Sequence, residues 1–372
     1  MIGVKGAAAI VAALSLASGA VAQEYRVEFL HPVDARWVWS TGRGISGGQM
    51  VGELHPVSHR GNGHAVVWNG DRNSWVDLHP KGALNSIALG VGRGIQVGRV
   101  QMPTDVFAAM WRGTPESLIN LDVDGYDGTD AYATDGVYQV GTASTIQTTQ
   151  AYVWQGSAES ARNITPPGAR NAGASDVHDG MVVGSAGFAD GTSRALLWTM
   201  PTGSFVDLHP RGYAVSHADG VFGTEQVGYV RDPSTQWQRA ALWHGTAESF
   251  VNLHPFSTEY QRSFAYATNG EVQVGEAWLT RGGRTDFHAL AWRGSAETVV
   301  DLHEFLPDAF ASSGANDIDE FCNIIGWADL DFGPTYAVVW RPVPEPGTLG
   351  AAGVGIALLV WRKAKREGRI KS

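Results

Sequence analysis

The chain has almost no cysteine and few charged residues. Cys322 is the single cysteine among 372 residues, so no disulfide can form within the chain. An exported fold would therefore depend on its apolar core, and we interpret Cys322 as a small buried apolar residue rather than a reactive thiol. Charged residues make up 17% of the chain and the net charge is -10. This balance argues against a nucleic-acid partner, which would require a basic face.

Familiar catalytic signatures are also missing. The sequence has no His-Glu-x-x-His zinc motif, no phosphate-binding loop and no Asp-box of the sialidase kind. Asp and Glu are frequent enough that composition does not exclude a glycosidase carboxylate pair. No particular pair stands out, so we predict no catalytic residue and no cofactor.

Glycine and tryptophan, in contrast, are abundant, with 47 and 14 residues. This combination is typical of short strands joined by tight turns. The Asx-Gly pairs that precede several apolar runs predict hairpin turns with positive φ; they are Asp135-Gly136, Asp179-Gly180, Asp219-Gly220 and Asn269-Gly270.

Most of the chain is a repeat. An apolar run ending in tryptophan recurs every 43 to 49 residues, at Trp68, Trp111, Trp154, Trp198, Trp243, Trp292 and Trp340. A Gln-Val-Gly element recurs with variation, ending at Gly52, Gly98, Gly141, Gly184, Gly228, Gly275 and Gly326. An Asp/Asn-Leu-His element lies between them and places histidines at His31, His79, His209, His254 and His303.

The period predicts the fold. Four strand-like runs in about 45 residues match one four-stranded propeller blade, so we predict an all-β, seven-bladed β-propeller over residues 23–341. Residues 25–54 begin in mid-repeat and supply three strands without the Trp-ending one, which residues 336–341 supply alone. We therefore expect N- and C-terminal strands to close the ring, which removes open sheet edges. A β-solenoid is the alternative.

The N-terminal end has the pattern of a secretory signal peptide over residues 1–22. Lys5 precedes an Ala-rich apolar run, and Ala20 and Ala22 form a small-x-small cleavage site before Gln23. An uncleaved membrane anchor is the alternative, although the run is short for a membrane span.

The C-terminal end, residues 342–372, has three parts in order. Pro344, Glu345 and Pro346 precede an apolar stretch over 348–361, expected to be helical, and a basic cluster follows it. The positive charges would hold this end in the cytoplasm. The order of parts resembles the PEP-CTERM sorting signal of bacteria. The resemblance implies transient residence in the inner membrane, processing by an exosortase, and release to the cell surface or extracellular matrix. A plain membrane anchor is the alternative.

The repeat also resembles the bacterial HAF family of extracellular repeats. His64 to Trp68 matches its opening His-Ala-Phe-Leu-Trp, and the segments ending at Gly136 and Gly270 match its Asn-x-x-Gly turn loosely. Leu-His-Pro stands where that family has Leu-Gly. The resemblance implies a fold and export but carries no catalytic residue.

Regularly repeated residues are explained by packing, so candidate site residues are those that break the pattern. We expect the repeated tryptophans to fill the wedges between blades and the repeated imidazoles to bond loop carbonyls rather than a metal. Trp237 and Trp278 do not repeat and could stack on sugar rings. Asp122, Asp124, Asp127 and Asp130 lie in one oxygen-rich loop, a weak candidate for calcium; a polar hairpin loop is the alternative.

Together these features predict an exported cell-surface or matrix protein with a binding or structural role rather than an enzymatic one. An exopolysaccharide or another envelope component would be its partner. The alternatives are a propeller-fold polysaccharide lyase or glycosidase, and a purely structural matrix role. We expect an enzyme to gather non-repeating carboxylates, His or Tyr at a deep axial mouth, and a binding propeller to present a shallower, repeat-symmetric face.

Overall fold

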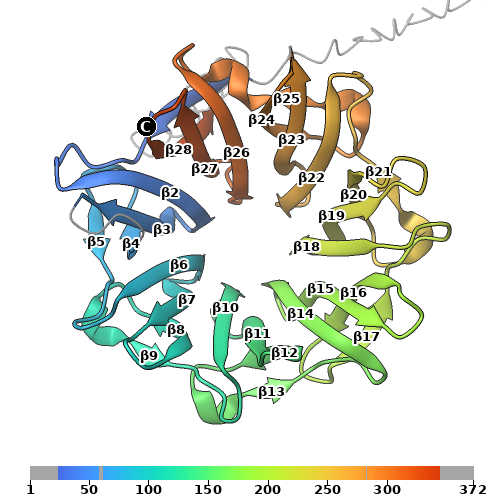
Figure 1. The fold of residues 1–372 in the computed structure, drawn as a ribbon, viewed down its shortest axis with the longest axis horizontal. Helices are drawn as coiled ribbons and strands as arrows, with labels where there is room; N and C mark the ends of the chain where they lie inside the picture. Colours follow the sequence, from blue (N-terminus) through green and yellow to red (C-terminus); the bar gives the residue numbers. More distant parts are fainter. Residues whose placement is uncertain (1–23, 58–61, 282, 344–372) are drawn as a thin grey trace, which may run out of the picture.

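The computed structural model describes residues 24–57, 62–281 and 283–343. They form seven four-stranded sheets around a central axis (Figure 1), which confirms the seven-bladed β-propeller. The predicted signal peptide, the Pro344–Pro346 motif and the predicted sorting helix lie outside the described residues. No helix within the described ranges is long and apolar enough to cross a membrane.

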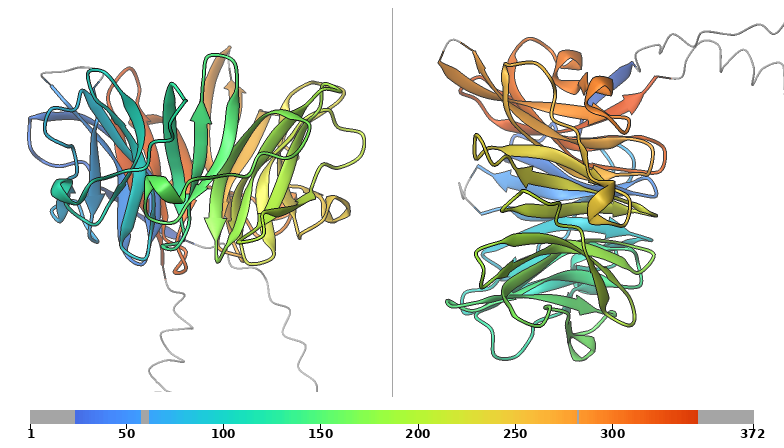
Figure 2. Two further views of the ribbon diagram at one scale, coloured as in Figure 1. Left: turned by 90° about the horizontal axis from the view of Figure 1, so that it is seen from below. Right: turned by 90° about the vertical axis from the view of Figure 1, so that its right-hand side faces the viewer.

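Each blade runs from an inner strand at the axis to an outer strand at the rim (Figures 1 and 2). The inner strands are β2 (Trp37–Ser46), β6 (Asn85–Gly92), β10 (Gly128–Thr134), β14 (Ala169–His178), β18 (Ser216–Phe222), β22 (Tyr260–Thr268) and β26 (Phe310–Ile318). The second strands are β3 (Gln49–Pro56), β7 (Ile95–Gln101), β11 (Gln139–Ser144), β15 (Met181–Phe188), β19 (Glu225–Arg231), β23 (Gln273–Arg281) and β27 (Ile324–Leu330).

The third strands end in or just after the repeated tryptophan: β4 (His64–Trp68), β8 (Val106–Trp111), β12 (Thr149–Trp154), β16 (Ser193–Thr199), β20 (Gln238–Trp243), β24 (Arg284–Trp292) and β28 (Thr335–Pro342). The outer strands are β5 (Trp75–Asp77), β9 (Ile119–Asn120), β13 (Arg162–Asn163), β17 (Ser204–Asp207), β21 (Val251–Asn252), β25 (Val300–Asp301) and β1 (Tyr25–Phe29). Short 3-10 turns precede or follow several outer strands: η1 (Pro115–Ser117), η2 (Ala158–Ser160), η3 (Ala247–Ser249), η4 (Ala296–Thr298) and η5 (Leu302–Phe305).

Strands from both ends of the chain close the ring, as predicted. β1 pairs antiparallel with β28, with Tyr25 opposite Pro342 and Phe29 opposite Val338. The predicted division of strands is wrong, however: the N-terminal segment gives one strand to the closing blade, and the C-terminal segment gives three. A repeat fixes the order of strands but not which one is innermost, so the blade boundary could not be located from the period.

The repeated tryptophans fill the wedges between blades, as expected. All seven are fully buried. There is one apolar cluster per interface, and each contains the tryptophan of one blade and apolar residues of the blade before it. Trp111, for example, packs in one cluster with Val51 and Val67. The tryptophans therefore belong to the core and are not available to a ligand.

The repeated glycines are required by a bulge in each inner strand. Four blades have an additional register shift near the start of the inner strand. In every blade the pairing of the inner and second strands shifts register beside the repeated glycine, as between Ala88 and Gly90. Opposite this bulge, a Cβ on Gly98 would lie 1.9 Å from the carbonyl oxygen of Ile87, and the same holds at 1.9 to 2.0 Å in every blade. No side chain fits at such a distance, so this position is restricted to glycine.

The repeated histidines join successive blades. His79 Nδ1 lies 2.8 Å from Ser86 Oγ at the start of the next inner strand, and its Nε2 lies 3.1 Å from Ala83 O. Ser86 Oγ in turn accepts the backbone N–H of Ala65 at 2.9 Å. His209 bonds Ser216 and Tyr213 O in the same way. The imidazole-to-carbonyl bond was predicted; the serine was not.

Candidate functional site

The bulge in each inner strand places one side chain at the axis. These seven bulge residues line an axial cavity of about 170 Å³. They are Arg43, Leu89, Tyr132, Ser175, Asp219, Tyr266 and Asn316. Their backbone positions are equivalent, yet only tyrosine occurs twice, so the axis is where the repeat loses its symmetry.

Sequence analysis did not propose these residues for a site, and its prediction of a positive-φ turn at Asp219-Gly220 is wrong, because both residues lie within β18 at the bulge. The sequence nevertheless holds a signal for the bulge residues. Each follows a short Ser-x-Ala-like element, as in Ser216-His217-Ala218-Asp219 and Ser263-Phe264-Ala265-Tyr266. The small residues pack under the neighbouring strand, and the next residue forms the bulge. The signal in the sequence was therefore a residue that differs between repeats and directly follows an element that is similar in all of them.

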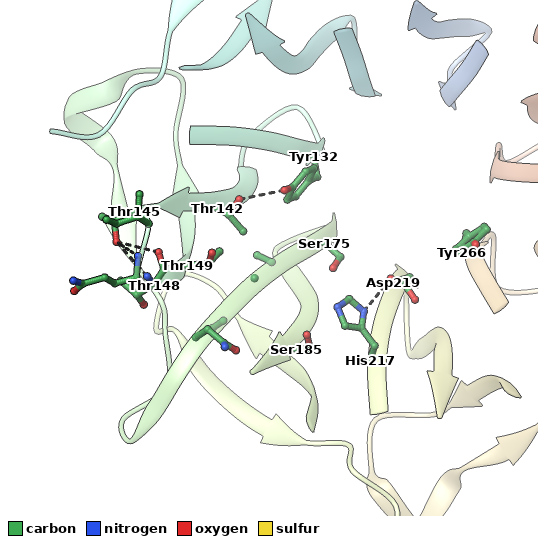
Figure 3. A pocket seen from close by; sticks show the side chains of 16 residues that line it. Tyr132, Thr142, Thr145, Thr148, Thr149, Ser175, Ser185, His217, Asp219 and Tyr266 are labelled. Carbon is green, nitrogen blue, oxygen red and sulfur yellow. Dashed lines mark hydrogen bonds and ion pairs between the residues drawn. The ribbon is translucent and has the colours of Figure 1, made fainter. Parts of the chain in front are cut away.

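A larger groove of about 730 Å³ opens beside the axial cavity on one face of the ring (Figure 3). β10, β11, β12, β14, β15, β18 and β22 contribute to it, together with the loop that joins β11 to β12. We call this the polar groove because hydroxyl and amide side chains dominate its lining. They belong to Tyr132, Thr142, Thr145, Gln147, Thr148, Thr149, Asn171, Ser175, Ser185 and Tyr266.

A His–Asp ion pair lies at the axial end of the polar groove (Figure 3). His217 Nδ1 lies 2.9 Å from Asp219 Oδ1. Burial alone would lower the pKa of His217, but the charge and contact of Asp219 outweigh it, and the pKa is raised. Asp219 Oδ2 is buried and accepts no hydrogen bond from any described residue. The groove therefore ends at an acceptor that has no partner within the described part of the chain.

Aromatic side chains continue from the groove over the next blades. We define the aromatic arc as His217, Tyr229, Phe264, Tyr266, Trp278, Phe287 and Trp327. Each ring lies 5.1 to 6.3 Å between centroids from at least one other, and the contacts run from β18 and β19 through β22, β23 and β24 to β27, with Tyr266 and Trp278 both in contact with Phe264. His217 and Tyr266 also line the polar groove, so the arc and the groove share two residues.

The two predicted ligand-contacting tryptophans occupy different places. Trp278 lies in the aromatic arc, with the guanidinium of Arg262 4.4 Å from its ring centroid. Trp237 lies just before β20, in the hairpin that joins it to β19, and its side chain is 36% exposed. It takes part in none of the ring contacts of the arc.

The four aspartates proposed for calcium do not form one set of ligands. Asp122 Oδ1 accepts a hydrogen bond from Thr129, and Asp127 Oδ2 accepts the backbone N–H of Ile146. Asp130 faces Arg99 at 3.5 Å. Within the described ranges, no group of three His, Cys, Asp or Glu residues could hold a metal ion. Asp122 instead contacts Thr129. Thr129 is the equivalent of Ser86, because it also accepts a backbone N–H of the preceding blade, and its partner Asp122 stands where other repeats have the histidine.

The opposite mouth of the axis is acidic, but its buried carboxylates have structural partners. Asp176 accepts the backbone N–H of Val221 at 2.9 Å, and Asp317 accepts that of Ile45 at 2.8 Å. Burial raises the pKa of Asp317 to about 8 despite these hydrogen bonds. Both carboxylates thus tie neighbouring inner strands together.

The comparisons with known proteins give separate findings for the C-terminal segment and for the propeller. The PEP-CTERM protein-sorting motif matches residues 342–366, a motif that marks exported proteins for exosortase processing and for the cell surface or extracellular space. The search of curated proteins finds no match.

Solved propellers share the fold at low identity. The β-propeller domain of the Trilobed protease from Pyrococcus furiosus is 10% identical, with a TM-score of 0.57 over 82% of this chain and 94% of that domain. Puromycin hydrolase is 10% identical with a TM-score of 0.58, and acylaminoacyl peptidase from Pyrococcus horikoshii is 9% identical with 0.56. This chain spans 56% and 55% of those two proteins. These similarities establish the propeller fold and nothing about activity.

Proposed function

We propose that this protein is an exported, non-enzymatic binding propeller and that its polar groove binds a polysaccharide of the cell surface or matrix. The observation that carries the proposal is the convergence of non-repeating hydroxyl, amide and aromatic side chains on one groove. Packing symmetry explains the tryptophans, glycines and histidines of the repeat. It does not explain why these positions differ between blades.

The chemistry of the groove suits a sugar. A pyranose presents hydroxyl groups at its rim and C–H groups on its faces. Hydroxyl and amide side chains both donate and accept hydrogen bonds, and aromatic faces cover apolar C–H surface. The sorting signal adds to the argument because it directs the chain to where exopolysaccharide is found. The likeness to HAF repeats and a different envelope partner remain predictions.

Affinity electrophoresis tests the proposal. The purified protein is run through native gels that contain laminarin, galactomannan, dextran, alginate or pectate. We expect at least one polysaccharide to retard the wild-type protein. The Asn171→Ala/Tyr132→Phe double variant should migrate faster than wild type in that gel. Asn73→Ala, in an exposed turn away from the groove, should behave as wild type. Equal migration of all three proteins in every gel would exclude the groove as a polysaccharide site.

A polysaccharide lyase or glycosidase is the second candidate, because His217, Asp219 and Tyr266 do gather at the axis. The raised pKa of Tyr266, caused by burial and by Glu276, works against its use as a base at neutral pH. Gly44 to Gly48 has the Gly-x-Ser-x-Gly spacing, but Ser46 ends β2 in a strand-to-strand hairpin, whereas a nucleophile elbow joins a strand to a helix. Incubating each retarding polysaccharide with the protein and measuring new reducing ends or unsaturated products tests this candidate.

A further inference from the structure

We infer that the bound polysaccharide is an uncharged linear chain of several sugar units that runs from the polar groove across the aromatic arc. This inference rests on the proposed function and adds the length and charge of the ligand. Its basis is that two rings that line the groove, His217 and Tyr266, are also members of the arc.

The arc has the extent of several sugar units. From His217 to Trp327 it includes five successive ring-to-ring contacts, each of 5.1 to 6.3 Å between centroids, and Tyr266 branches from Phe264. Its rings are only partly buried, whereas the repeated tryptophans are fully buried. A single sugar in the groove would leave most of this partly exposed aromatic surface without a partner.

Arg262 supplies hydrogen-bond donors in the arc. Its guanidinium lies over Trp278, 4.4 Å from the ring centroid. In the part of the chain that the structure describes, it forms no ion pair. A guanidinium stacked on an aromatic ring is held in place by cation–π attraction, and its N–H groups remain available to sugar hydroxyls at the rim of the stacked unit.

The charges around this surface favour an uncharged polymer. Asp219 lies at the end of the groove, and Glu276 accepts a hydrogen bond from Trp278 Nε1 at 3.4 Å in the arc. The whole chain carries a net charge of -10. A polyanion would be repelled by this field, and one unpaired arginine does not compensate for it.

Calorimetric titration with oligosaccharides of two and of six units, prepared from the polysaccharide that retards the protein, tests the inference. We expect the six-unit chain to bind at least tenfold more tightly than the two-unit one. Trp278→Ala should weaken binding of the six-unit chain roughly threefold to tenfold and leave the two-unit chain unchanged. Trp278→Phe, which keeps an aromatic ring, should restore most of the affinity. Phe321→Ala, at an exposed site on the opposite face, is the matched control, and thermal unfolding verifies that each variant is folded.

The outcomes separate the inference from the proposed function. If both oligosaccharides bind equally, or if Trp278→Ala does not affect the longer one, the arc is not part of the site although the groove still binds. If alginate or pectate binds and the uncharged polymers do not, the inferred absence of charge is wrong. If none of the five polysaccharides binds, the proposed function itself fails.

Discussion

At the scale of single residues, a buried serine connects successive blades. Ser216 Oγ accepts the backbone N–H of Ala195 at 2.9 Å and lies 2.7 Å from Nδ1 of His209. His209 Nε2 lies 2.9 Å from Tyr213 O. These contacts are all satisfied if the neutral imidazole carries its proton on Nε2 and the serine hydroxyl donates to Nδ1. The Leu-His element is therefore a structural joint between blades.

Removing this hydroxyl should be costly. Ser216→Ala leaves a buried N–H and a buried imidazole nitrogen without partners, and we expect a loss of about 2–4 kcal/mol in the free energy of unfolding. Thr224→Ala, in an exposed turn of the same blade, should change stability by less than about 0.5 kcal/mol. Urea denaturation of the two variants measures the difference. Equal midpoints would show that the joint contributes nothing.

A glycine opposite the bulge gives a second residue-scale prediction. Gly98→Ala would bring Cβ to 1.9 Å from Ile87 O, so the inner strand must move away from the second strand. We expect a loss of more than about 3 kcal/mol, because backbone cannot yield as a flexible side chain can. Gly113→Ala, at φ +79° with open space around it, should cost only about 1 kcal/mol. Thermal unfolding of the pair measures this contrast.

At the scale of elements, β1 completes the last blade. It covers the edge of β28, and its Tyr25 is buried in the core of that blade. Leu30, just after β1, accepts a hydrogen bond from Trp68 Nε1 at 3.1 Å and so also supports the first blade.

Deleting residues 24–30 should therefore destabilise the whole ring rather than one sheet. The deletion opens the edge of β28, removes apolar residues from two core clusters and leaves Trp68 Nε1 without its acceptor. We expect loss of the cooperative unfolding transition, or a midpoint far below that of a protein that begins at Glu24. Circular dichroism during heating measures it. An unchanged midpoint would show that ring closure is dispensable.

The elements were predictable from the sequence because their determinants repeat. The tryptophan at the end of each third strand and the glycine opposite each bulge recur in every blade, so one copy explains the others. The division of the closing blade was not predictable, since the period is the same wherever a blade is taken to begin. The bulge residues were missed because a bulge is a feature of pairing between strands. Tyr132 and Asp219 share a backbone position but no chemistry.

At the scale of the whole molecule, the candidate site and the end of the last described strand lie on opposite faces. β28 begins at Thr335, beside the end of β27. It ends at Pro342, past the position where Ile324 of β27 pairs with Ile318 of β26. Ile318 lines the acidic mouth, whereas the polar groove opens at the start of the inner strands. The last described strand therefore ends on the face away from the groove.

Replacing the central acid of the sorting motif tests the route of the protein. Glu345→Ala should prevent exosortase processing and leave the protein in the inner-membrane fraction. Glu116→Ala, on an exposed turn of the propeller, should be released as the wild type is. Cell fractionation followed by immunoblotting measures the distribution. Normal release of Glu345→Ala would contradict processing at this motif.

The response of stability to pH depends in part on four of the repeated histidines. Burial lowers the pKa of His254 and of His303 to about 4, and it also lowers those of His31 and His79. Below the unfolded-state pKa of about 6.5, the unfolded chain therefore binds protons that the folded chain does not. The stabilising contribution is complete above about pH 6.5 and is lost as the pH falls towards 4.

Asp317 acts in the opposite direction. Its folded-state pKa of about 8 means that the folded chain keeps a proton that the unfolded chain releases above about pH 4. Burial also raises the pKa of Asp130, Asp176, Glu276 and Asp329, so a group of carboxyls opposes the imidazoles between pH 4 and 6.5. We therefore expect stability to fall slightly from pH 6.5 towards pH 8, and we expect the contribution of the imidazoles to be measurable below pH 6.5 as the difference between the wild type and a histidine variant.

Urea midpoints at half-unit steps from pH 4.5 to 8 measure this curve. A His254→Gln/His303→Gln variant should be less stable at pH 6.5, because it loses two joints, but its difference from the wild type should shrink as the pH falls below 6.5. His244→Gln, at an exposed position, should reproduce the wild-type curve. A stability difference between the wild type and the double variant that does not shrink as the pH falls from 6.5 to 4.5 would show that the buried imidazoles are not the neutral partners that the serine hydroxyls require.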